Sequence, residues 1–169
     1  MLRNLLLLSL LFTSSAGLSE DRAERLNRQG IALSREGRYR EALVRYSEAI
    51  VLAPDYAEPY YNRGKARLNL ADYAAAEADF TAALSLTPDN AETFNNRGIA
   101  RKNQRNLRGA IADYDSALKL APDLYRVYLN RGIARFELGQ DSAACTDFRT
   151  ARRHGIPQAA EAFRQAGCK

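Results

Sequence analysis

The sequence predicts an all-α protein in which antiparallel pairs of helices stack in a row. Three observations carry this prediction. Ala, Arg and Leu, which favour helix, dominate the 169 residues, whereas the strand-forming residues Val and Ile are sparse. Gly, Ala, Pro and aromatic residues recur with a spacing of 34 residues. Within one such unit, two apolar stretches of helical period follow each other across a short break, which is typical of a helix hairpin.

The repeat is defined by several series of residues in one register. The small residues are Gly30, Gly64, Gly98 and Gly132; Ala42, Ala76, Ala110 and Ala144; and Ala49, Ala83, Ala117 and Ala151. The prolines are Pro54, Pro88 and Pro122, and the aromatic residues are Tyr46, Phe80, Tyr114 and Phe148, and Tyr60, Phe94 and Tyr128. Self-similarity at such a period indicates a repeat array.

The second unit illustrates how each hairpin is expected to form. Its helical stretches run over about residues 60–70 and 73–86, and Pro88 ends the second of them. Glycine inside a helix is less stable than alanine by roughly 1 kcal/mol, so its return in every unit indicates close packing. We therefore expect Gly64 and Ala76 to lie on the facing sides of the two helices.

This order of an aromatic residue, Gly, Ala, a second aromatic residue and Pro resembles the tetratricopeptide repeat. The resemblance covers four units, at about residues 23–56, 57–90, 91–124 and 125–156. It implies a right-handed α-solenoid whose first helices line a concave face. The first unit departs from the pattern at Leu26 and Gln29, and the third at Leu107.

A capping helix and a signal peptide are expected at the two ends of the chain. Residues 157–169 contain a short helical pattern that would cover the apolar surface of the last hairpin. Residues 1–17 contain Arg3, an apolar run and then small residues, which is typical of a signal peptide. The run is too short for a bilayer, which needs about 20 residues. We expect a secreted or periplasmic protein, cleaved near Gly17, with no stable membrane insertion afterwards.

The residue inventory argues against enzymatic, cofactor, metal and nucleic-acid functions. His154 is the only histidine, and its place at a helix end predicts capping of carbonyls or an interaction with the helix dipole. No catalytic constellation or phosphate loop can be assembled around it. Carboxylates such as Asp113 and Asp115 are expected to be solvated. The net charge of +5 is mild, and acidic and basic residues are interleaved rather than pooled.

The two cysteines, Cys145 and Cys168, are expected to form a disulfide. An even number of cysteines in an exported protein favours this pairing. The chain runs about eight residues from Cys145 to the end of its helix, and the capping helix returns over a similar length. Antiparallel packing would therefore bring the two sulfurs together.

The polar residues of the first helices supply the candidate binding site. Asn62, Asn96 and Asn130 recur in one register, each followed by Arg and Gly. In another member of the resembled family, asparagines at this position hold peptide backbone, and an amide can both donate and accept. The alternative is that these side chains solvate the groove or bond across neighbouring repeats. The neighbouring candidate groove residues are Lys65, Asn95, Lys102 and Asn103.

The expected function is that of an adaptor that holds another protein or a peptide in its concave groove. The lysines would favour acidic or carboxylate-ended segments. The alternative is a structural subunit of an envelope assembly that contacts its partners through the convex face or the ends of the array.

Overall fold

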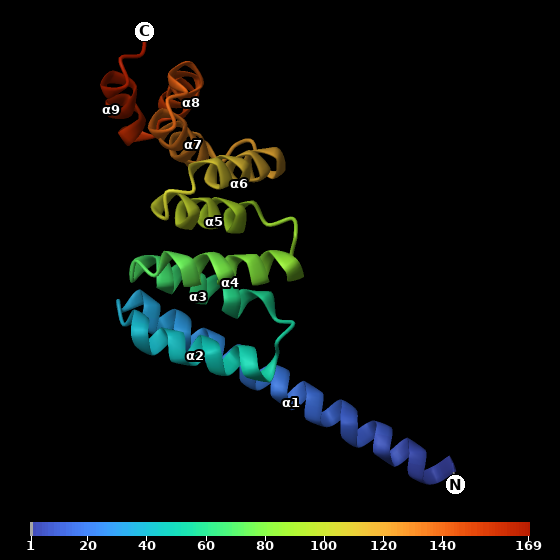
Figure 1. Cartoon of the computed structure of the whole chain (residues 1–169). Helices are drawn as coiled ribbons and strands as arrows, with labels where there is room; N and C mark the ends of the chain where they lie inside the picture. Colours follow the sequence, from blue (N-terminus) through green and yellow to red (C-terminus); the bar gives the residue numbers. More distant parts are fainter. Residues whose placement is uncertain (1) are drawn as a thin grey trace.

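The computed structural model describes the backbone of residues 2–169 and the side chains of residues 17–169. The described chain is helical, without strands, and its hairpins follow one another from the blue end of the ribbon to the red end (Figure 1). This is the predicted all-α array. The expected signal peptide, residues 1–17, lies outside the described side chains except for Gly17, so it stays a prediction.

The described residues form eight helices in four hairpins and a ninth helix at the C-terminal end. The helices are α1 (Leu2–Arg35), α2 (Tyr39–Leu52), α3 (Ala57–Asn69), α4 (Tyr73–Leu86), α5 (Ala91–Asn103), α6 (Leu107–Leu120), α7 (Tyr125–Glu137), α8 (Asp141–Arg153) and α9 (Pro157–Gln165).

Each helix packs mainly on its two neighbours in the chain. The first helix of every hairpin also touches the first helix of the next, so that α1, α3, α5, α7 and α9 adjoin in that order. The exposed surface along these five helices is called the groove face below. Figure 1 shows the resulting stack of hairpins with α9 at its C-terminal end.

Local sequence explains where the helices begin and end. The first helix of the second hairpin begins at Ala57, three residues before the expected start. Glu58 lies in its first turn, where a carboxylate interacts favourably with the positive end of the helix dipole. The Asn90 side chain accepts a hydrogen bond from the Thr93 N–H at 2.9 Å and caps α5. Helix α4 ends at Leu86, two residues before Pro88.

The repeated glycines lie directly under the repeated aromatic rings. A Cβ atom added to Gly64 would lie 2.8 Å from Phe80 Cε1, which is closer than carbon atoms approach without displacement. The same contact joins Gly30 to Tyr46, Gly98 to Tyr114 and Gly132 to Phe148. The close packing expected at these glycines is therefore confirmed, and the contact is made to the aromatic ring.

The turn inside each hairpin needs one residue with a positive φ angle. The four residues are Gly37, Ala71, Arg105 and Gly139, with φ angles of 76°, 58°, 65° and 79°. Glycine adopts this conformation without steric cost, whereas other residues are disfavoured by about 1–2 kcal/mol. The second and third hairpins therefore contain strained turns.

The capping helix is fixed to the last hairpin by a disulfide and by apolar packing. Cys145 and Cys168 form the predicted disulfide, with their Cα atoms 5.5 Å apart. Phe163 is buried, and the Arg152 guanidinium lies 4.3 Å from the centre of its ring. Arg149 donates a hydrogen bond to the backbone oxygen of Lys169 at 2.9 Å. These contacts hold α9 against α8.

In the part of the chain that the structure describes, no helix combines the length and apolarity needed to cross a membrane.

Candidate functional site

Three hydrogen bonds connect successive first helices along the groove face. Each joins a residue to the residue 35 positions later: Asn62 Nδ2 donates to Asn27 Oδ1 at 3.0 Å, Asn96 Nδ2 to the Tyr61 hydroxyl at 3.3 Å, and Asn130 Nδ2 to Asn95 Oδ1 at 3.0 Å. We call these bonds the cross-repeat links. They correspond to one of the two alternatives considered from the sequence, in which the asparagines bond across neighbouring repeats.

Asn95 and Tyr61 make further hydrogen bonds beside the links. Asn95 Nδ2 donates to Asn96 Oδ1 at 3.4 Å, so that two links share one chain of amides. The Tyr61 hydroxyl donates to Glu92 Oε2 at 3.1 Å. Burial, followed by the charge of Glu92, raises the pKa of Tyr61 to about 12. Tyr61 therefore keeps its proton at neutral pH and can donate to Glu92 while it accepts from Asn96.

The linked amides keep hydrogen-bonding capacity for a ligand. An asparagine amide has two N–H donors and an acceptor oxygen, and a link occupies one N–H of Asn62, Asn96 or Asn130. All three side chains are half-buried rather than freely solvated. The links thus fix the orientation of one amide in each of three successive repeats.

The remaining predicted site residues lie in different surroundings. Lys65 Nζ lies 5.3 Å from the centre of the Tyr61 ring, on the groove face next to the first link. Lys102 is half-buried in the last turn of α5. Asn103 Nδ2 donates to the backbone oxygen of Ile99 at 2.8 Å, so this amide bonds to its own helix and takes no part in the links.

A cavity of about 310 Å³ opens between α1 and α3. Its lining combines Asn62 and Lys65 with Ile31, Ser34, Arg35, Tyr39, Tyr46, Ala66 and Asn69. Two of these residues are cationic and none carries a carboxylate, so the cavity favours an anionic group. Sequence reasoning missed Arg35 because the equivalent positions Asn69, Asn103 and Glu137 show no common chemistry.

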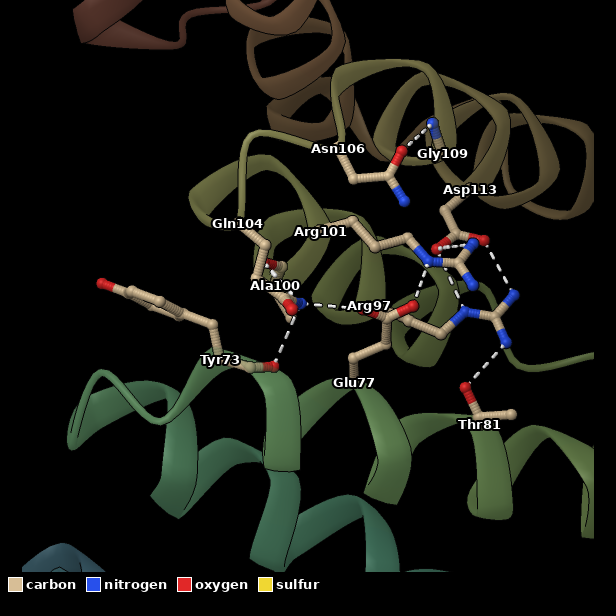
Figure 2. Close-up of polar contacts among 10 residues, drawn as sticks. All are labelled: Tyr73, Glu77, Thr81, Arg97, Ala100, Arg101, Gln104, Asn106, Gly109 and Asp113. Atoms are coloured by element: carbon tan, nitrogen blue, oxygen red, sulfur yellow. Dashed lines mark hydrogen bonds and ion pairs between the residues drawn. The ribbon is translucent and has the colours of Figure 1, made fainter.

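Buried ion pairs hold the first helices in place, and these pairs were not predicted. Asp113 is 3% exposed, and its oxygens bind Arg97 Nη2 at 2.8 Å and Arg101 Nη1 at 3.0 Å (Figure 2). The expectation that Asp113 would be solvated is therefore wrong. Two guanidinium groups replace water around a carboxylate that faces the first helix of its own hairpin.

The same arrangement recurs in the second and fourth hairpins. Asp79 pairs with Arg63 and Arg67, and Asp147 pairs with Arg131 and Arg135. The first arginine of each set also donates to the preceding hairpin: Arg63 to Ser47, Arg97 to Thr81 and Arg131 to Asp115. Figure 2 shows how Arg97 lies between Asp113 and Thr81.

These arginines directly follow the linked asparagines in the sequence. Each ion pair therefore fixes the helix turn that carries an amide of the groove face. The signal that could have found the pairs is an Arg–Asp spacing of 16 residues that returns in three units. The first hairpin lacks the pair because Gln29 stands at the position of Arg63 and Arg45 at the position of Asp79. Arg45 binds Glu48 at 2.8 Å instead.

The His154 side chain packs against an aromatic ring at the end of α8. His154 is the residue that follows the last residue of α8, and its ring stacks on Tyr125 with the ring centres 3.7 Å apart. Within residues 17–169, no cluster of three His, Cys, Asp or Glu side chains could hold a metal ion.

Family models match most of the array. Models described as a TPR repeat or tetratricopeptide repeat match residues 30–70, 57–90 and 95–158. No catalytic family is among these matches, and no curated protein sequence matches the chain significantly.

Solved structures similar to the chain include peptide complexes. The first TPR of Spaghetti (RPAP3), bound to the HSP90 peptide SRMEEVD, is 26% identical with a TM-score of 0.70, over 71% of this chain and 95% of that one. The second TPR domain of human RPAP3, in complex with the HSP70 peptide SGPTIEEVD, is 25% identical with a TM-score of 0.66, over 71% and 98%.

A third similar structure covers more of the chain. Pseudomonas aeruginosa pilF is 19% identical with a TM-score of 0.77, over 88% of this chain and 68% of that one, a likeness of fold alone. The repeated residues, the stacked hairpins, the matching models and these structures agree. The chain belongs to the tetratricopeptide-repeat family.

Proposed function

We propose that the protein is an adaptor that binds an extended segment of another protein along its groove face. The observation that carries this proposal is the row of cross-repeat links, which presents one oriented amide in each of three successive repeats. A peptide backbone offers donors and acceptors in alternation, and amides can pair with both. Such a row suits an extended segment of any sequence.

The cavity between α1 and α3 suggests which segment is preferred. Arg35 and Lys65 line it and no lining residue carries a carboxylate, so it would attract an acidic side chain or a chain terminus. Two similar structures hold peptides that end in Glu-Glu-Val-Asp, which supports a preference for acidic, carboxylate-ended segments.

The place of action that we propose is the cell envelope or the space outside the cell. The signal-peptide pattern of residues 1–17 supports export. The Cys145–Cys168 disulfide agrees with it, because disulfides persist in oxidising compartments.

A structural subunit of an envelope assembly is the second candidate, and the N-terminal end of the array favours it. Val44 and Val51 of α2 are 53% and 81% exposed. They line an open groove of about 710 Å³ together with Leu26. An apolar surface of this kind can serve as a contact between proteins.

Peptide selection separates the two candidates. Peptides would be selected on the purified protein from a random dodecapeptide library, and their affinities measured by calorimetry. Replacing Asn62, Asn96 and Asn130 together by Ala should weaken binding tenfold or more, because each neutral hydrogen bond contributes about 0.5–1.5 kcal/mol. The half-buried links also predict a lower unfolding midpoint for this variant.

Two further variants keep the result interpretable. Lys65→Glu leaves the links intact and should weaken the binding of acidic peptides at low salt. The control variant Ser85→Ala/Ser116→Ala removes hydroxyls that bond only to their own second helices, and it should bind like the wild type. If the selected peptides bind the asparagine and lysine variants with unchanged affinity, the binding site does not lie on the groove face.

A further inference from the structure

The groove face has a second cavity, at the register of the first but three repeats later. This α7–α9 pocket has a volume of about 420 Å³. The equivalent residues of the two cavities are Ile31 and Ile133, Ser34 and Phe136, Arg35 and Glu137, and Tyr46 and Phe148. One architecture is therefore present at both ends of the face.

The chemistry of the two cavities differs. The α7–α9 pocket is lined by the apolar residues Leu129, Ile133, Phe136, Phe148 and Ala162 and by the polar residues Glu137, Gln158, Glu161 and Gln165. Phe136 is 41% exposed although it is a large apolar residue, whereas its equivalent in the first cavity is Ser34. The first cavity thus suits an anion, and the second suits an apolar group.

The pocket replaces a cross-repeat link. In the first three hairpins, Asn27, Tyr61 and Asn95 bond to the first helix that follows. Leu129 holds the same register in the last hairpin, and the helix that follows is α9. The row of polar links therefore ends where the apolar pocket begins, on one continuous face.

The two carboxylates in the lining of the pocket are paired with cations. Glu137 binds Arg105 at 3.2 Å, and Glu161 binds Arg164 and, at 2.8 Å, Gln165. Because both lining carboxylates are already paired, charge contributes little to the selection of a ligand here. The apolar floor is what remains to discriminate between side chains.

We propose that the α7–α9 pocket binds one large apolar side chain, aromatic or long aliphatic, of the segment held along the groove face. The inference rests on the proposed function and deepens it. Its volume accommodates one such side chain, and its place at the end of the links puts it within reach of the same extended segment. The bound segment then has a fixed direction, with its acidic group near α1 and its apolar group near α9.

The disulfide is a positioning element of this pocket. Helix α9 supplies one wall through Ala162, and the Cys145–Cys168 bond holds α9 against α8. Without that bond, α9 would separate more readily from the last hairpin and the pocket would lose its wall. Binding at the cross-repeat links, which lie on α1 to α7, would persist.

A mutant cycle between protein and peptide tests the pocket. Dodecapeptides selected on the wild-type protein should share one large apolar residue at a fixed position. Replacing that residue by Ser should weaken binding to the wild-type protein about tenfold, since burying such a side chain contributes on this scale. The same replacement should weaken binding clearly less on a Phe136→Ser protein, because the pocket then loses the most exposed side chain of its apolar lining.

Two controls complete the cycle. Leu120→Ser removes an apolar side chain of similar exposure, 42%, from α6, and it should keep the tenfold preference. Cys145→Ser/Cys168→Ser should lose the preference but keep its dependence on the asparagines. A peptide whose affinity depends on the asparagines, but which has no apolar residue coupled to Phe136, would overturn the assignment of the pocket and leave the proposed function standing. Failure to select any peptide would overturn it together with the proposed function.

Discussion

Tyr114 has a hydroxyl group that is fully buried and meets no hydrogen-bond partner among the described residues. Burial, followed by the charges of Asp113 and Glu137, raises the pKa of Tyr114 above its ordinary value. Tyr46, at the equivalent position of the first hairpin, instead has its hydroxyl 3.1 Å from Ser34 Oγ. The other two hairpins have phenylalanine at this position, Phe80 and Phe148.

Replacing Tyr114 by Phe should therefore stabilise the protein. The ring packing on Gly98 is retained, and removal of an unsatisfied buried hydroxyl should raise the free energy of unfolding by about 1 kcal/mol. Tyr46→Phe is the matched control, and it should lower the free energy by about 0.5–1.5 kcal/mol through loss of its hydrogen bond. Urea unfolding measures both. A Tyr114→Phe variant as unstable as Tyr46→Phe would show that the hydroxyl has a partner.

Packing at the residue scale could be predicted wherever a repeated residue type has only one physical reason to recur. Gly64 inside a helix is such a case. Asp113 is not, because a carboxylate on a helix can be solvated or paired, and only the position of Arg97 and Arg101 in space decides between the two. The unsatisfied hydroxyl of Tyr114 was equally hidden, since Tyr46 in the same register is satisfied.

At the scale of elements, the hairpins and the capping helix follow from the periodicity of the sequence. The tight turns could not be predicted in the same way. The residues with a positive φ angle are Gly37, Ala71, Arg105 and Gly139. Ala71 and Arg105 are not residue types that indicate a positive φ angle, so the sequence does not predict the turn geometry in these two hairpins. The α1–α3 cavity and the α7–α9 pocket were also hidden, because they depend on the space between first helices from different repeats.

Helix α9 is the element whose stability depends most directly on a covalent bond. Closing a loop across 23 residues should stabilise the protein by about 3 kcal/mol in the chain-entropy model. In Cys145→Ser/Cys168→Ser, we expect the loss mainly as faster amide hydrogen exchange in α9 and α8, because repeat arrays unfold locally. Exchange in α3 to α6 should hardly change. Uniformly faster exchange along the whole chain would contradict this local role.

At the scale of the whole molecule, buried ion pairs on one side of the first helices orient amides on the other. The row of asparagines was visible in the sequence, and their bonding across repeats was one of two alternatives there. Hairpins two to four each combine an Arg–Asp pair with a cross-repeat link. The first hairpin lacks the ion pair and exposes Val44 and Val51 instead, which is where the alternative function would act.

Site-specific photocrosslinking in the native host would show which face of the array contacts the partner. A photoreactive residue would be placed at the exposed Lys65 or the half-buried Lys102 on the groove face, and at the exposed positions Ala78 or Ala112 of the second helices α4 and α6. We expect Lys65 and Lys102 to crosslink to the same partner protein, and Ala78 and Ala112 not to crosslink to it. Crosslinks from Ala78 and Ala112 alone would contradict binding on the groove face and would place the partner on the second helices.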